Sequence, residues 1–210
     1  MFTASTTDPA VLFFTILSFL IVIGLVISVH EAAHAFFANL RGDPTARLMG
    51  RMTLNPVAHI DPLGTIVVPL FLLIFGGFIF GWAKPTPVNP LNFPHPRKDS
   101  AIVALAGPVS NLLLAIAFAF LFRLFQYGLL SDVVRLNLML GIFNLLPIPP
   151  LDGFKVVMGA LPKRAALSLA SLEAYGPAFL MIFLFLFLIA FSRPLIAIIS
   201  ALTAILTGIS

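Results

Sequence analysis

The chain of 210 residues contains no cysteine, and only 10% of its residues are charged. Without cysteine it can form no disulfide bond and can offer no thiol nucleophile and no thiolate metal ligand. A soluble domain carries roughly 25% charged residues. The low charge, the hydrophobic share of 60% and the mean hydropathy of +1.10 therefore exclude an ordinary water-soluble protein. We predict an integral membrane protein.

The charges that remain are mostly basic, with a net charge of +4 and an isoelectric point near 10. No patch of mixed basic and aromatic residues favours nucleic acid as a partner. In a membrane protein, a basic excess is typical of cytoplasmic loops. The N-terminus lacks the basic region of a cleaved signal peptide. Because no repeat or appended soluble domain is visible, residues 1–210 are expected to form a single membrane-embedded domain.

Six apolar segments follow one another along the chain. They cover about residues 9–40, 63–82, 100–125, 133–146, 170–191 and 194–209. The predicted fold class is an all-α polytopic membrane protein, with about five transmembrane helices and a re-entrant or partly extended segment around residues 63–96. The lipid bilayer is therefore the first expected partner.

The basic residues distinguish between two topologies. If all six segments cross, six basic residues lie on each side of the membrane and no orientation is favoured. If segment 63–82 enters and returns on the same side, the split becomes nine against three, a strong asymmetry that the positive-inside rule favours. The nine are Arg41, Arg47, Arg51, Lys84, Arg97, Lys98, Lys155, Lys163 and Arg164. Only the second topology places Asp152 on the same side as His30 and His34.

A His30-Glu31-Ala32-Ala33-His34 motif lies inside the first apolar segment, where ionisable side chains are costly. The two imidazoles project from one helix face and can share a metal ion, which compensates for their burial. Glu31 lies beside the pair and can act as a general base. A metal-free polar cluster between helices and a metal-transport site stay open as alternatives to a hydrolytic zinc site.

A catalytic zinc ion usually has a third protein ligand. The remaining candidates are His59, His95, Glu173 and several aspartates. Asp152 stands out because it follows the prolines that end the fourth apolar segment, and because Gly153 permits a tight turn. Asp152 can also cap a helix beginning near Phe154. The two roles are compatible, since a carboxylate has two oxygens.

Three motifs occur in a fixed order, namely HEAAH at 30–34, Ala106-Gly107-Pro108 followed by Asn111, and Asn144-Leu-Leu-Pro-Ile-Pro-Pro-Leu-Asp152-Gly153. Together they resemble the site-2 protease family of intramembrane zinc metalloproteases. The strings at 42–45, 51–62 and 81–85 are similar to the compact prokaryotic branch of that family. The resemblance covers most of residues 29–153.

The resemblance implies a zinc endopeptidase that hydrolyses peptide bonds in or near transmembrane segments of membrane-protein substrates. His30, His34 and Asp152 would bind Zn²⁺. Glu31 would be the general base and later the general acid. Asn144 would donate a hydrogen bond to the substrate or the oxyanion, or would instead be a helix-packing amide.

Three further residues receive supporting roles. Asn111 is expected to bridge spans, and Gly107 is expected to allow close helix approach. His59 either supports or gates the site, or is a loop histidine in an Asn/Pro turn. Segment 63–82 and the extended stretch after it are candidates to pair with an unwound substrate strand.

A metal transporter and an inactive scaffold are the two alternative functions. A metal transporter usually repeats its ligands in corresponding halves, and a second intramembrane histidine cluster is absent from the sequence. An inactive scaffold that binds transmembrane helices would not need the competent residues found at every motif position. The expected location is a prokaryotic plasma membrane, with a multi-pass chain and the site nearer the cytoplasmic side. Substrate identity, regulatory trigger and oligomeric state are left open by the sequence.

Overall fold

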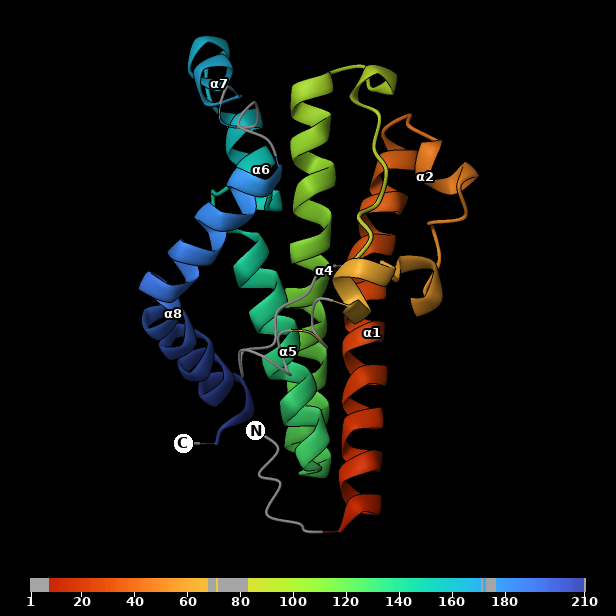
Figure 1. The fold of residues 1–210 in the computed structure, drawn as a ribbon, viewed down its shortest axis with the longest axis vertical. Coiled ribbons are helices and arrows are strands. Elements are labelled where there is room, and N and C mark those ends of the chain that lie inside the picture. The colour runs from red at the N-terminus through yellow and green to blue at the C-terminus, as the bar shows by residue number, and fades with distance from the viewer. Residues whose placement is uncertain (1–7, 68–70, 72–82, 171, 173–176, 210) are drawn as a thin grey trace.

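The computed structural model describes residues 8–67, 71, 83–170, 172 and 177–209 (Figure 1). Every regular element in these ranges is helical, which confirms the all-α prediction. The α-helices are α1 (Pro9–Leu40), α2 (Thr45–Leu48), α4 (Pro96–Phe125), α5 (Gly128–Asn144), α6 (Asp152–Ala160), α7 (Lys163–Ala170) and α8 (Pro177–Thr207). Three short helical turns are η1 (Pro56–His59), η2 (Pro62–Val67) and η3 (Pro90–Asn92).

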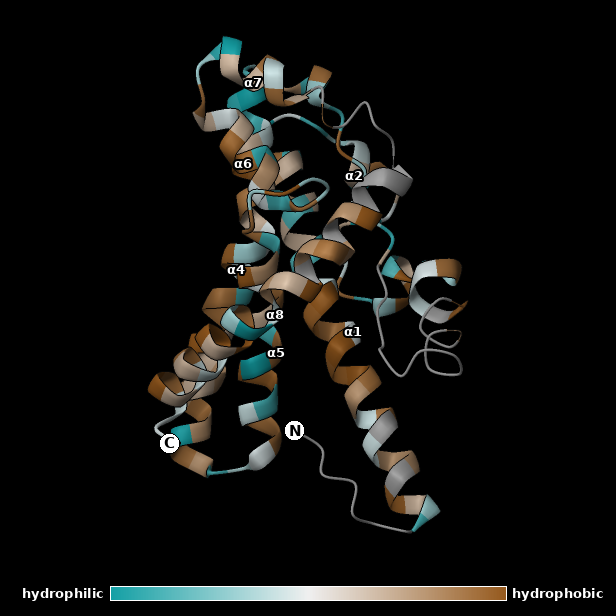
Figure 2. Cartoon of the chain, turned by 60° about the vertical axis from the view of Figure 1, so that its left-hand side comes forward, coloured by the Kyte–Doolittle hydropathy of each residue, from teal (hydrophilic) through white to brown (hydrophobic). Residues whose placement is uncertain are grey.

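Three helices within the described ranges are long and apolar enough to cross a membrane. They are α1, α4 and the Ile189–Thr207 part of α8. With 32 residues, α1 is about 48 Å long, and Figure 2 shows hydrophobic residues along most of it. Its Phe13, Phe14 and Leu20 side chains are 57–65% exposed. Because water would penalise such a surface, lipid is the solvent that this helix requires.

The last two apolar segments form one helix, so the predicted break between residues 191 and 194 was wrong. Pro194 lies inside α8. Figure 1 shows that α8 changes direction along its length. A proline inside a helix removes one backbone hydrogen bond and displaces the preceding turn, which bends the helix without ending it.

The chain leaves and returns at one place around the predicted re-entrant segment. Most of that segment, residues 68–70 and 72–82, lies outside the described residues. His59 precedes the segment and Lys84 follows it. The Lys84 backbone N–H donates a hydrogen bond to the His59 carbonyl at 2.9 Å. Residues 83–89 then run without regular secondary structure. A segment that enters and leaves the membrane on one side must have its two ends close together, and the bond between His59 and Lys84 agrees with this.

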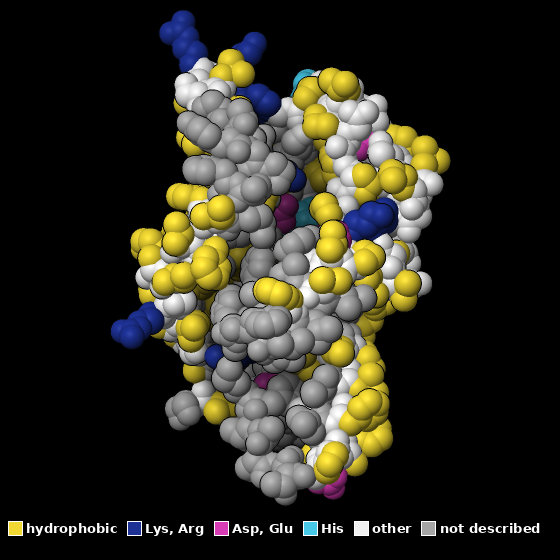
Figure 3. All heavy atoms as spheres, viewed as in Figure 1, with side chains coloured by type: hydrophobic (Ala, Val, Ile, Leu, Met, Phe, Trp, Pro, Cys, Tyr) yellow, Lys and Arg dark blue, Asp and Glu magenta, His cyan; other side chains and the backbone are white. Residues whose placement is uncertain are grey.

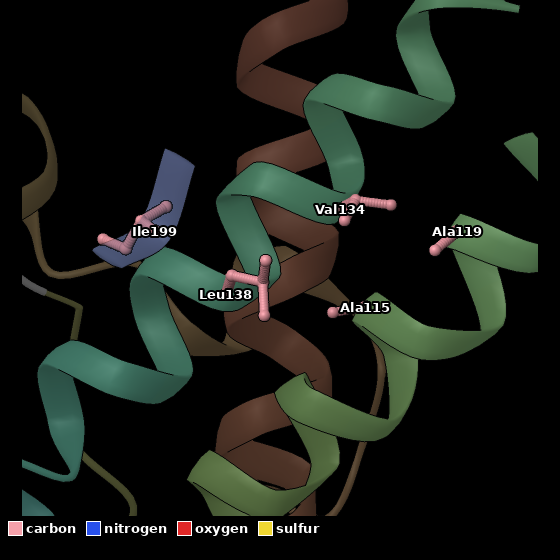
Figure 4. Close-up of a cluster of buried hydrophobic side chains, with 5 residues drawn as sticks. All are labelled: Ala115, Ala119, Val134, Leu138 and Ile199. Carbon is pink, nitrogen blue, oxygen red and sulfur yellow. The ribbon is translucent and has the colours of Figure 1, made fainter. Parts of the chain in front are cut away.

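Helix α4 is the central element, with contacts to α1, α5, α6 and α8. Its Ala115 and Ala119 pack against Val134 and Leu138 of α5 and Ile199 of α8 (Figure 4). Small residues let helix backbones approach closely in lipid, where van der Waals packing replaces the hydrophobic driving force. The α4–α5 hairpin therefore holds the end of α5, and with it the start of α6, close to α1.

Two acidic residues fasten the ends of α1 and α4 together. Arg41, directly after α1, donates from Nε to the fully buried Asp99 carboxylate at 2.8 Å, in the first turn of α4. Asp43 is also fully buried and accepts from the Asn89 backbone N–H and the Asn92 side chain, both at 2.7 Å. The chain leading into α4 is thus bound to the chain leaving α1.

Candidate metal centre

Three ligand-type side chains from two distant parts of the chain meet between α1 and α6. His30 and His34 project from α1, and Asp152 is the first residue of α6. The two Nε2 atoms are 3.0 Å apart, and Asp152 Oδ2 lies 3.2 Å from His30 Nε2 and 3.1 Å from His34 Nε2. The two histidines are only 4% and 6% exposed. The structure thus brings these three predicted residues to one point.

The second nitrogen of each imidazole is held by an oxygen that fixes the ring. His34 Nδ1–H donates to the Val103 carbonyl at 2.7 Å, and a carbonyl can only accept. His30 Nδ1–H donates to the side-chain oxygen of Asn111 at 2.6 Å. In the neutral form of each ring, the lone pair is then on Nε2, which faces Asp152.

The donor set fits a zinc ion. Tetrahedral zinc with bonds near 2.0–2.1 Å holds its ligand atoms about 3.3 Å apart, and the three separations here are 3.0–3.2 Å. Two imidazole lone pairs and a carboxylate oxygen at such distances repel one another unless a proton or a metal cation lies among them. Three protein ligands also leave the fourth position open, as a catalytic site requires.

Two glycines make room for this convergence. A Cβ atom on Gly107 of α4 would lie 2.3 Å from His34 Nε2 and 2.7 Å from His30 Cε1. A Cβ atom on Gly153 would lie 2.2 Å from the Leu145 carbonyl oxygen at the end of α5. Gly107 was expected to let helices approach, and the structure shows that its close neighbours are the imidazole rings themselves. Gly153 likewise lets the turn before α6 fold back onto α5.

Glu31 is held by a residue that the sequence did not single out. The Thr86 backbone N–H donates to Glu31 Oε2 at 2.8 Å, and the Thr86 hydroxyl donates to the Glu31 carbonyl at 3.0 Å. Pro85 and Pro87 flank Thr86, and a residue before proline favours extended backbone. The two prolines predict an extended backbone at Thr86, but they do not predict its contact with Glu31.

Two other predicted residues have backbone carbonyls as their hydrogen-bond partners. Asn144 is half-buried at the end of α5, where its side-chain NH₂ donates to the Leu140 carbonyl at 2.9 Å. His59 is buried in η1, with Nε2 at 3.0 Å from the Thr53 carbonyl. Through its own carbonyl, His59 holds Lys84 and so the beginning of the stretch that reaches Glu31.

Asn111 has the bridging position that the sequence predicted. It is fully buried on α4 and joins His30 of α1 to Asn137 of α5, donating from Nδ2 to Asn137 Oδ1 at 3.0 Å. Asn137 was missed, although an asparagine inside an apolar helix is a signal of buried hydrogen bonding.

Comparison with known proteins assigns the chain to a family. The model of peptidase family M50 matches residues 18–135 and 128–189. The chain belongs to peptidase family M50. As an M50 peptidase, it is 42% identical over 191 residues to the "Putative zinc metalloprotease YwhC" of Bacillus subtilis, covering 83% of this chain and 81% of the relative.

A second relative of this M50 peptidase extends the comparison. The "Putative zinc metalloprotease Rip2" of Mycolicibacterium smegmatis is 30% identical over 155 residues, which are 70% of this chain and 58% of the relative. No solved structure matches the chain. The resemblance to site-2 proteases is confirmed, and the M50 peptidase is an intramembrane zinc metalloprotease. Neither transport nor an inactive scaffold is favoured.

Proposed function

We propose that His30, His34 and Asp152 are the zinc ligands of this peptidase and that Glu31 is its general base and acid. The observation that carries the proposal is the meeting of the three ligand atoms within 4.8 Å of one another, although Asp152 follows His34 by 118 residues. The substrates of the peptidase are transmembrane segments of other membrane proteins. Residues 1–210 act as one membrane-embedded domain.

When bound, zinc supplies a Lewis acid that polarises the scissile carbonyl and makes water a better nucleophile near neutral pH. The Glu31 carboxylate takes a proton from the attacking water and returns it to the leaving amine nitrogen. Thr86 holds that carboxylate through its N–H at 2.8 Å. Asn144, at the end of α5, turns from its own helix to donate to the developing oxyanion.

Water and substrate must reach the site from the end of α1 that bears Arg41. His30 and His34 lie ten and six residues before the end of α1 at Leu40, about 9–15 Å along the helix. Figure 3 shows Lys and Arg side chains mainly in its upper half, toward the end that holds α7. By the positive-inside rule this end faces the cytoplasm, in a prokaryotic plasma membrane.

The substrate must also lose helical structure before it is cut. A peptide carbonyl inside a helix is bonded within that helix and is shielded by its side chains. The irregular stretch at residues 83–89 touches Glu31 through Thr86 and so lies beside the site. An unwound substrate segment is therefore received next to this stretch.

Zinc content and cleavage of a single-span model substrate test the proposal together. We expect Asp152→Ala to lose both zinc and cleavage, because two ligands hold zinc poorly. Glu31→Gln should keep its zinc and lose cleavage by a factor of at least about 100. Lys163→Gln, at an exposed position in α7, is the control and should match the wild type. Full cleavage by Glu31→Gln, or normal zinc content in Asp152→Ala, contradicts the assignment.

A further inference from the structure

Two buried amide side chains connect His30 to helix α5. His30 of α1 bonds to Asn111 of α4 at 2.6 Å, and Asn111 bonds to Asn137 of α5 at 3.0 Å. The side-chain Nδ2 of Asn137 then donates to the Val133 carbonyl, one turn earlier in α5, at 2.9 Å. Both asparagine side chains are fully buried. Three helices are thus joined by one series of hydrogen bonds.

The backbone carbonyl at the end of the series sets the direction of every bond in it. Val133 O can only accept, so Asn137 must present its NH₂ to that carbonyl and its oxygen to Asn111. Asn111 must then donate to Asn137, which turns its own oxygen toward His30. The Val26 carbonyl, 3.5 Å from Asn111 Nδ2, favours the same orientation.

The last bond decides which nitrogen of His30 carries the proton. An oxygen of Asn111 at 2.6 Å from Nδ1 requires a proton on Nδ1. The lone pair of the neutral ring is then on Nε2, the atom that faces Asp152 and His34. His34 reaches the same tautomer directly, since its Nδ1 bonds to the Val103 carbonyl. Only His30 depends on side chains for its tautomer.

We infer that Asn137 is a positioning residue for zinc binding, which acts on His30 through Asn111 without touching the site. This inference rests on the proposed function, because it assigns to Asn137 the task of keeping a zinc ligand in its binding tautomer. Loss of the Asn137 oxygen leaves the Val26 carbonyl, at 3.5 Å, as the partner that orients the Asn111 amide. This weaker restraint lets the amide rotate and present NH₂ to His30, which would favour the wrong tautomer. Residues that orient metal ligands typically contribute a factor of 10–100 in metal affinity.

A purely structural role for Asn137 predicts a different result, and two variants of equal shape separate the two roles. In Asn137→Thr, the hydroxyl can donate to the Val133 carbonyl, as helical threonines do toward the residue four earlier, and can accept from Asn111. In Asn137→Val, the same branched shape is present without a hydroxyl. Any packing defect is therefore shared, and only the valine variant loses the directional bond.

The experiment measures zinc affinity by competition with a chromophoric chelator, and the visible spectrum after cobalt substitution, on full-length protein in lipid nanodiscs. We expect Asn137→Val to bind zinc about 10–100 times more weakly than Asn137→Thr, with an altered cobalt spectrum. Thr203→Val is the matched control, because it removes a similar hydroxyl bond to the Ile199 carbonyl, 2.8 Å long, in α8. It should bind zinc as the wild type does.

The possible outcomes separate the inference from the proposed function. If the wild type binds no zinc, or if Asp152→Ala binds it equally well, the proposed function fails. If the wild type binds zinc and the threonine and valine variants have equal affinities and spectra, the inference about Asn137 is overturned alone. Should Asn137→Val fail to fold, Asn137→Ser and Asn137→Ala repeat the comparison with smaller side chains, and equal affinities overturn the inference in the same way.

Discussion

Gly107 has no space for even one methyl group beside the two histidines. The nearest atoms to its added Cβ would be His34 Nε2 at 2.3 Å and His34 Cε1 at 2.6 Å, both in a ring that carries a ligand atom. A side-chain ring can move aside where a backbone cannot. A methyl group here should therefore displace the ligands and leave the helices in place.

We expect Gly107→Ala to fold and insert normally but to bind zinc at least about 10 times more weakly, because second-sphere changes commonly cost 10–100-fold. Zinc competition and a thermal unfolding midpoint on the same sample measure the two effects. Gly128→Ala is the control, since an added Cβ at Gly128 meets nothing within 4 Å. Unchanged zinc affinity in Gly107→Ala would show that the rings do not lie against α4.

At this scale, helical spacing and a proline break made His30, His34 and Asp152 candidates, and the favoured topology together with the family resemblance predicted that they converge. It did not predict Thr86 or Asn137. Their importance comes from contacts with Glu31 and Asn111, 55 and 26 residues away. Such pairings are made by packing, and no local pattern contains them.

Among the elements, the Asp43 carboxylate holds the loop before α4 at two residues, Asn89 and Asn92. Burial raises the pKa of Asp43, but hydrogen bonds from Thr45, the Asn89 backbone and the Asn92 side chain outweigh it and hold that pKa below its ordinary value. A lowered pKa in the folded state means that the ionised form stabilises the fold. This stabilisation is present above the unfolded pKa, about 3.9, and is lost as the pH falls through the folded value.

We expect Asp43→Asn to speed hydrogen exchange of residues 84–93 severalfold at neutral pH, because an amide cannot accept all the bonds that the carboxylate accepts. The difference from the wild type should shrink below about pH 4. Because Thr86 lies in this stretch, cleavage should slow as well. Asp8→Asn removes the same charge at the N-cap of α1, where asparagine caps equally well, and should leave residues 84–93 unchanged.

Helix ranges followed the hydrophobic pattern, whereas helix ends and bends did not. The third and fourth predicted segments became α4 and α5 with small shifts in their ends. Pro194 was taken as a boundary but lies within α8. A proline destabilises a helix only near its own position. The packing of α8 against α4 and α5 stabilises the continuous helix by more than the proline destabilises it.

In the whole molecule, the end of α1, the start of α4 and helix α7 lie at one end, and the α4–α5 connection lies at the other (Figure 1). Nine basic residues belong to the first end in the topology that the sequence favoured, and the return of the chain from His59 to Lys84 supports that topology. The orientation of the protein in the membrane is inferred from the distribution of basic residues. Contacts within the chain do not indicate which end faces the cytoplasm.

Because the chain has no cysteine, single introduced cysteines can report that orientation directly. We expect a membrane-impermeant maleimide to label Gln126→Cys in intact cells and Lys163→Cys only after permeabilisation. Both positions are exposed, one between α4 and α5 and the other at the start of α7. The reverse pattern would place the site near the outer face.

Under the proposed ligand assignment, the distance along the chain between the ligands also determines when the site can be assembled. Asp152 follows His34 by 118 residues, and the α4–α5 hairpin lies between them. A nascent chain that has delivered only α1 to the bilayer carries two imidazoles, too few for a catalytic zinc ion. The proposed set of three ligands is therefore complete only after the ribosome has added Asp152, which follows the hairpin at the start of α6.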